Sequence, residues 1–197
     1  IKINTETDFA AKSETFLNFV DTLGQFILEN NDLNLSKDKF LGLKLNNITI
    51  TDQFNSMIAK IGENLILNEL IIFDKNKSKY SYYIHNSYKK NIGKIISIVK
   101  YSTDKNDEKI QTLSKNLCMH IAAMKPESLD IDDLDEKIIN NEKNIQKELI
   151  LSSGKSADIA EKILEGKMKK YYSEVTLYNQ SYILDQDLTV KKIIDNH

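Results

Sequence analysis

The chain has 197 residues, of which 41% are hydrophobic and 28% are charged, and its formal net charge at pH 7 is -2. This length suits one large domain or two small lobes, and the composition predicts an ordered, soluble globular protein rather than a long disordered segment. A net charge so close to zero excludes a bulk electrostatic field that would draw the chain to nucleic acid or to a membrane.

The residue types narrow the function classes further. All of the positive charge comes from lysine, and the absence of arginine disfavours nucleic-acid readout because arginine supplies the two-pronged contact most used on guanine. Cys118 is the single cysteine, so no intrachain disulfide can form, which fits a reducing compartment. No hydrophobic run approaches the roughly 18 residues that a membrane span needs, and no signal peptide is visible. We therefore expect no membrane association.

The first part of the chain predicts a short strand followed by helices. Residues 1–5 alternate like a strand, and Ser13 and Glu14 then stand at the expected start of an amphipathic helix. The apolar residues of that helix recur at helical spacing: Phe16, Phe19, Val20, Leu23 and Ile27. A shorter helix ends near Ile61, with Asp52 as its expected N-cap and Gly62 as its expected C-terminal stop.

The middle of the chain predicts strands. Residues 65–73, 80–85 and 92–101 are rich in β-branched and aromatic side chains, and Asn, Lys and Ser connectors separate them. We predict a three-stranded antiparallel meander packed with helices.

Helices resume at Asp107, and Pro126 closes the first of them. Residues 137–172 predict a helical hairpin that turns near Gly154, and Thr189 starts a final short helix. Strands flanked by runs of helices, without strict alternation, indicate an α+β fold. We expect a two-lobed core, with residues 1–105 in the first lobe and residues 106–197, including the hairpin, in the second.

Two segments resemble ligand-binding motifs but lack essential residues. The GKS run at residues 154–156 would need an earlier glycine where Leu149 stands, and a strand before it. The acidic residues 130–136 lack the glycine and the ligand spacing of a calcium loop, and they suit the start of a helix instead. We predict no metal site and no cofactor.

The histidines do not predict catalysis either. No nucleophile motif accompanies His85, His120 or His197. Leu117, Cys118 and Ile121 fall on or beside the apolar face of a helix, and no second ligand cluster stands at zinc spacing, so we interpret Cys118, Met119 and His120 as core residues. The sequence therefore predicts no catalytic residues and a protein that is not an enzyme.

Phe9 is unusual because it stands among polar and charged residues in NTETDFAAKSE, residues 4–14. It lies seven residues before Phe16, so a continued helix would place it on the same buried face, and periodicity alone favours a role in the core. The other interpretation is that Phe9 is offered to a molecule outside the chain. Periodicity leaves both open.

NTETDFAAKSE resembles the TDFVA-like motif that opens the core of bacterial translation elongation factor Ts. Further matches to that family follow in order along the chain: IGEN at residues 61–64, Y-x-H at 83–85, IGKIISIV at 92–99, CMHIAAMKP at 118–126, SGKS at 153–156, and EKILEGKMKKYYSEVTLYNQSYI at 161–183. The resemblance spans nearly the whole chain. Departures such as Ala10, where valine is common, and Ser156, where proline is usual, concern peripheral contacts. We expect that the small N-terminal helical domain of the family, related to ubiquitin-associated domains, is missing ahead of Ile1.

The resemblance implies a fold like the dimerisation domain of this family and a guanine nucleotide exchange factor in translation elongation. Such a factor binds elongation factor Tu, in its GDP-bound and nucleotide-free forms, and promotes GDP release by disturbing the magnesium and phosphate site. The resemblance implies partner contacts at that magnesium site by Asp8, Phe9, Ala10 and Ala11, and other partner contacts by Ile61, Gly62 and His85. Ile61 keeps the alternative of a core residue, and Gly62 that of a helix stop.

A second hypothesis is a translation-associated module of the same fold that holds a protein or RNA without accelerating release. Residues 165–174 mix lysines and tyrosines as single-strand binders do, although this pattern also suits the solvated face of a helix. The family implies the bacterial cytoplasm, and the abundance of lysine, isoleucine and asparagine also fits an organelle.

Overall fold

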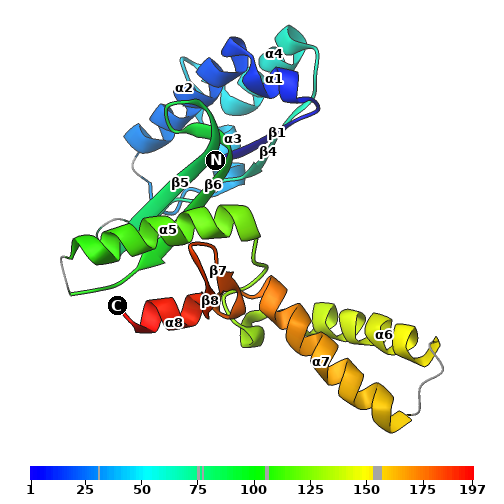
Figure 1. Cartoon of the computed structure of the whole chain (residues 1–197). Helices are drawn as coiled ribbons and strands as arrows, with labels where there is room; N and C mark the ends of the chain where they lie inside the picture. Colours follow the sequence, from blue (N-terminus) through cyan, green and yellow to red (C-terminus); the bar gives the residue numbers. More distant parts are fainter. Residues whose placement is uncertain (31, 75, 77, 105–106, 153–156) are drawn as a thin grey trace. The chain divides into compact units, whose positions relative to one another are not determined.

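The computed structural model describes every residue except 31, 75, 77, 105–106 and 153–156. Its backbone gathers into two compact units (Figure 1). The first comprises Ile1–Tyr80, Ile84–Ile96 and Lys100–Ser102, and the second comprises Ser81–Tyr83, Ser97–Val99 and Thr103–His197. Helices and short two-stranded sheets in one chain are compatible with the predicted α+β class. The lobe boundary expected near residue 105 stays a prediction.

The first unit consists of a long helix with shorter helices and strands around it. Its elements are β1 (Lys2–Thr5), α1 (Asp8–Lys12), α2 (Glu14–Asn30), α3 (Lys37–Gly42), β2 (Lys44–Leu45), β3 (Ile48–Thr49), α4 (Ile50–Ile61) and β4 (Leu65–Glu69). β1 pairs antiparallel with β4, and Thr5 lies opposite Leu65 at the end of the ladder. This register brings the chain after β1 beside the chain before β4.

The core of the first unit is built on α2, whose predicted apolar face is confirmed. Four of the five predicted side chains are buried, namely Phe16, Phe19, Leu23 and Ile27, and Val20 packs partly buried against them. Leu23, Phe40 and Ile50 are fully buried in the same cluster. The rings of Phe19 and Phe54 meet edge to face with centroids 5.1 Å apart, which joins α2 to α4.

The ends of α4 confirm one sequence prediction and correct another. Gly62 stops the helix as predicted, with φ of 79° and its N–H donating to the Ile58 carbonyl at 2.8 Å. The N-cap is Thr49 and not Asp52, because the Thr49 hydroxyl accepts from the Asp52 N–H at 3.1 Å. The helix therefore begins three residues earlier, close to the turn between β2 and β3.

The predicted three-stranded meander is not what the strands form. β4 pairs with β1, whereas β5 (Lys79–Lys89) and β6 (Ile92–Tyr101) pair with each other in a separate two-stranded sheet. Local composition identified these strands, but the choice of partner depends on contacts between residues far apart in sequence. The β5–β6 hairpin contributes residues to both units.

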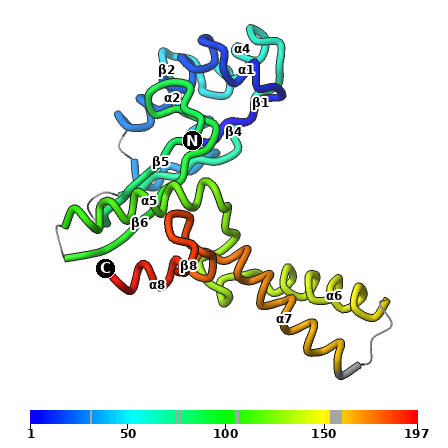
Figure 2. Tube along the Cα trace, viewed as in Figure 1, coloured from blue at the N-terminus to red at the C-terminus, as the bar shows by residue number. Residues whose placement is uncertain are grey.

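The second unit combines a long helix with one buried face, a helical pair and a small C-terminal sheet. Its elements are α5 (Glu108–Met124), η1 (Ile131–Asp133), α6 (Glu136–Ser152), α7 (Ala157–Val175), η2 (Leu177–Asn179), β7 (Ser181–Tyr182), β8 (Asp185–Thr189) and α8 (Val190–Asp195). α6 and α7 run side by side, as Figure 2 also shows, which agrees with the predicted hairpin. Its turn near Gly154 lies outside the described residues. The final helix predicted to start at Thr189 is present as α8, which begins one residue later, with Thr189 as its N-cap.

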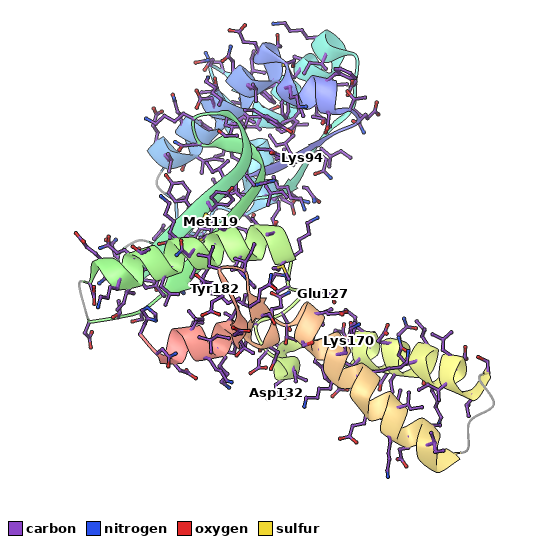
Figure 3. All side chains as sticks on the ribbon, viewed as in Figure 1. Lys94, Met119, Glu127, Asp132, Lys170 and Tyr182 are labelled. Carbon is purple, nitrogen blue, oxygen red and sulfur yellow. The ribbon has the colours of Figure 1, made fainter. Side chains whose placement is uncertain are left out.

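A buried polar network ties α5 to the C-terminal segment. His120 and Gln180 are both fully buried, and His120 Nε2 lies 2.9 Å from Gln180 Oε1. The Ile183 N–H donates to His120 Nδ1 at 3.2 Å, so Nε2 carries the proton and the imidazole is neutral. The ring of His120 also stacks on that of Tyr182, which is labelled in Figure 3, with centroids 5.9 Å apart. The interpretation of His120 as a core residue is therefore confirmed.

Burial lowers the pKa of His120 below its usual value, and the hydrogen bond to Gln180 opposes this shift in part. In the unfolded chain a histidine titrates near pH 6.5. As the pH falls below that value the unfolded chain takes up a proton that the folded chain resists, so the folded chain loses stability.

We therefore expect the free energy of unfolding to fall between about pH 7.5 and pH 5, partly through His120. His120→Gln should flatten this pH dependence, and it should also cost about 1–3 kcal/mol at neutral pH because buried partners lose their hydrogen bonds. Urea unfolding at both pH values measures the two effects. His85→Gln replaces an exposed histidine and is the matched control. An identical pH slope in the parent and His120→Gln would contradict this account.

None of the helices within the described parts of the chain has the length and apolar content required to cross a membrane.

Candidate functional site

The candidate site is built on α1, a single turn of helix between two capping residues. Thr7 is the N-cap, and its hydroxyl accepts from the Ala10 N–H at 3.2 Å. Ser13 closes the turn, because its N–H and its hydroxyl both donate to the Ala10 carbonyl. The Ser13 hydroxyl also accepts from the Phe16 N–H at 3.3 Å, so one residue ends α1 and supports the start of α2.

Phe9 lies on the outside of this turn and is 88% exposed. The interpretation of Phe9 as a core residue, which periodicity alone favoured, is wrong. Ser13 has extended backbone angles (φ -65°, ψ 138°), so α1 and α2 are not one continuous helix and the seven-residue spacing to Phe16 loses its meaning. Ala10 takes the inward position instead and is only 4% exposed.

Two of the three predicted contact segments of the first unit meet through a residue that the sequence analysis did not single out. The Glu63 carboxylate accepts from the Thr7 N–H at 3.0 Å and from the Thr7 hydroxyl at 2.6 Å. Glu63 directly follows Gly62, so the segment at Ile61 and Gly62 is joined to the turn that carries Asp8 and Phe9. The residues lie 56 positions apart, and no periodic pattern connects them. Two sequence signals could have found the pair: Thr7 is an N-cap threonine just after β1, and Glu63 is an acidic residue just before β4.

A second polar contact reaches the turn from β6. Lys94 Nζ lies 3.2 Å from both carboxylate oxygens of Asp8, and Figure 3 labels this lysine. Both side chains are more than half exposed, so the ion pair contributes little to stability. Beside Lys94, the backbone of Gly93 lies so near β5 that a Cβ there would come 3.1 Å from the His85 carbonyl oxygen. Two neighbouring residues of β6 thus reach predicted site residues: Lys94 contacts Asp8, and Gly93 lies close to the backbone of His85.

The remaining predicted site residues differ in their exposure. Ile61 is half-buried and packs against the core of the first unit, so its core role is present in the structure. Gly62 and His85 are exposed, and Gly62 is also the helix stop described above. Ala11 is half-buried.

This surface combines an apolar and a charged side chain. It offers one exposed aromatic ring and one carboxylate on a turn whose two ends are capped by hydrogen bonds. Within the described ranges no group of three or more His, Cys, Asp and Glu side chains is arranged to hold a metal ion. An apolar ring held at a fixed place can insert between the side chains of a protein partner.

Comparison with known proteins gives a consistent result along the chain. A family model described as elongation factor TS matches residues 6–197. A protein named elongation factor Ts from Syntrophotalea carbinolica is 36% identical over the whole chain, which covers 63% of that relative. Proteins of the same name from Ehrlichia canis and Rhodospirillum centenum are 36% and 34% identical over 98% and 100% of the chain. The chain spans 67% and 64% of those two relatives.

The backbone at Gly62 makes a prediction about stability. With φ at +79° and no atom within 4 Å of a built Cβ, a side chain at this position meets backbone strain and no steric clash. Gly62→Ala should cost about 1–2 kcal/mol of unfolding free energy, and Gly62→Asn should cost less because asparagine tolerates the left-handed region. Urea unfolding measures both. Equal stability of the alanine variant and the parent would show that this backbone conformation does not persist in solution.

Proposed function

The chain belongs to the elongation factor Ts family, and from this premise we propose that it is a guanine nucleotide exchange factor in translation elongation. Its partner in this proposal is elongation factor Tu, which it binds in the GDP-bound and the nucleotide-free forms. It makes and breaks no covalent bond, and it acts by promoting the release of GDP so that GTP can bind. We include the bacterial cytoplasm in the proposal as the place of action.

The observation that carries the proposal is the exposure of Phe9 on a capped turn. Burying a phenylalanine stabilises a folded protein or a complex by about 1.5–3 kcal/mol, and the exposed Phe9 does not stabilise this fold in that way. A partner that covers Phe9 stabilises the complex by this amount. The exposed aromatic ring therefore supports a protein contact at the position where the family resemblance implies one.

The proposed mechanism is a competition between this chain and the magnesium ion of the partner. Magnesium requires nearly ideal octahedral geometry, so a small displacement of the segments that hold its ligands weakens the ion and the nucleotide together. Phe9 and Asp8 press on those segments of the partner. Ala10 and Ala11 support Phe9 and Asp8 from within this chain. Ala10 is suited to this supporting role because its side chain is buried in its own unit.

Further contacts hold the complex without acting on the nucleotide. We propose that Ile61 and Gly62 form a second contact and His85 a third. Gly62 and His85 are exposed, as such contacts require, and Ile61 is half-buried. The helical pair α6–α7 and the C-terminal segment reach other surfaces of the partner in this proposal.

Phe9→Ala should slow GDP release by about tenfold or more, because the group that presses on the nucleotide site is lost. Its melting temperature should match that of the parent, since exposed substitutions change stability by about 0.5 kcal/mol or less. Fluorescent GDP release from elongation factor Tu measures the first effect and circular dichroism the second. Leu28→Ala is the matched control, because Leu28 is a 79% exposed apolar residue in the same unit. GDP release at the parental rate with Phe9→Ala would contradict the proposed role of Phe9.

Exchange and simple binding differ in their thermodynamic linkage. An exchange factor weakens GDP binding, so GDP with magnesium must weaken the binding of this chain by the same factor, which is commonly about 5- to 150-fold. Calorimetric titration of nucleotide-free and GDP-loaded elongation factor Tu measures this factor directly. Equal affinities for the two forms would contradict exchange and favour the module that binds without accelerating release.

A further inference from the structure

The direction of Phe9 is set by the backbone that carries it. Its ring is 88% exposed, so packing within the chain constrains it little. α1 has only five residues, and a helix that short is not stable by itself in water. Contacts from outside the turn must therefore hold α1 in place if Phe9 is to reach a partner in a defined orientation.

The register of β1 and β4 supplies such a contact. Thr5 lies opposite Leu65 at the last paired position of the ladder. Thr7 and Glu63 stand two residues beyond this pair, one on each chain segment. The ladder and the Gly62 turn together place the Glu63 carboxylate against Thr7, the N-cap of α1.

The contact between Glu63 and Thr7 is strong and directional. Each of the two carboxylate oxygens accepts one hydrogen bond, at 3.0 Å from the Thr7 N–H and at 2.6 Å from its hydroxyl. Bonds to an ionised acceptor are about twice as strong as neutral ones. The same Thr7 hydroxyl accepts from the Ala10 N–H, so the bond it donates to Glu63 fixes the direction in which it caps α1. The chain of bonds runs from Glu63 through Thr7 to the residue that follows Phe9.

The Lys94–Asp8 ion pair is a weaker candidate for the same task. Both of its side chains are more than half exposed, and it holds the turn by a flexible lysine. Glu63, by contrast, is half-buried and contacts the backbone of the N-cap itself.

We propose that Glu63 is a positioning residue for nucleotide exchange, which acts through Thr7 to hold Phe9 in the orientation that the partner meets. The proposal rests on the proposed function and adds a residue to it. Glu63 need not touch the nucleotide or the magnesium ion. Its effect on exchange should pass through the α1 turn, and mainly through Phe9.

The test is a double-mutant cycle in fluorescent GDP release from elongation factor Tu. Glu63→Gln keeps the shape of the side chain but leaves one oxygen to accept two hydrogen bonds. It should lower the slope of release rate against chain concentration by about five- to tenfold. In the Phe9→Ala background the same substitution should have a clearly smaller effect, because only Asp8 on the turn is then left to be misplaced. Glu29→Gln, an exposed carboxylate at the end of α2, is the matched control and should exchange at the parental rate.

Substitutions at Thr7 test the other side of the contact and guard against a loss of folding. Thr7→Ser keeps the hydroxyl and should exchange like the parent, whereas Thr7→Val removes it and should resemble Glu63→Gln. Circular dichroism confirms that each variant is folded under the assay conditions. Parental exchange by Glu63→Gln, or equal fold losses from Glu63→Gln with and without Phe9, would overturn the proposal. If the parent itself does not accelerate release, the proposed function fails and this inference fails with it.

Discussion

The antiparallel pairing of β1 with β4 is the constraint on which the candidate site depends. It brings together segments about 60 positions apart in sequence, and its last pair, Thr5 with Leu65, determines which residues meet just beyond the ladder. A shift of one residue would turn every side chain of β1 to the opposite face and would remove Glu63 from Thr7. The buried side chains of Leu65 and Leu67 oppose such a shift, because they anchor β4 in the core of the first unit. Hydrophobic packing thus secures the polar contact that holds α1.

The site is a surface that presents side chains, and this suits a protein that acts on another protein. An enzyme of small molecules needs a concave pocket lined by groups that react, whereas a protein that displaces a nucleotide from a partner needs a shape that is complementary to one state of that partner. The first unit carries a buried alanine and an exposed phenylalanine on adjacent positions of one helical turn, which supports the proposed contact with a partner. Ala10 faces the interior of the unit, and Phe9 stays exposed to solvent.

The sequence predicted those features that depend on neighbouring residues. The apolar face of α2, the stop at Gly62 and the start of the final helix near Thr189 follow from spacing and from the conformational preferences of single residues. The pairing of β4 could not be predicted in this way, because its partner, β1, is adjacent to it in space but distant from it in sequence. Periodicity misled at Phe9, since Ser13 interrupts the helix that would have carried it inward. The family resemblance pointed to a contact role for Phe9, but it did not reveal Glu63, whose importance appears only when Thr7 lies opposite it.

The central claim is that Phe9 meets the nucleotide-binding domain of the partner, and photo-cross-linking from that position tests it most directly. A benzoylphenylalanine placed at residue 9 would be irradiated in the presence of elongation factor Tu, and the cross-linked peptide would be identified by mass spectrometry. We expect the cross-link to fall in the GTPase domain, next to the segments that hold the magnesium ion. The same probe at Leu28, which is also exposed in the first unit, gives the background level. A cross-link from residue 9 that stays at this background, or that falls within this chain, would contradict the account.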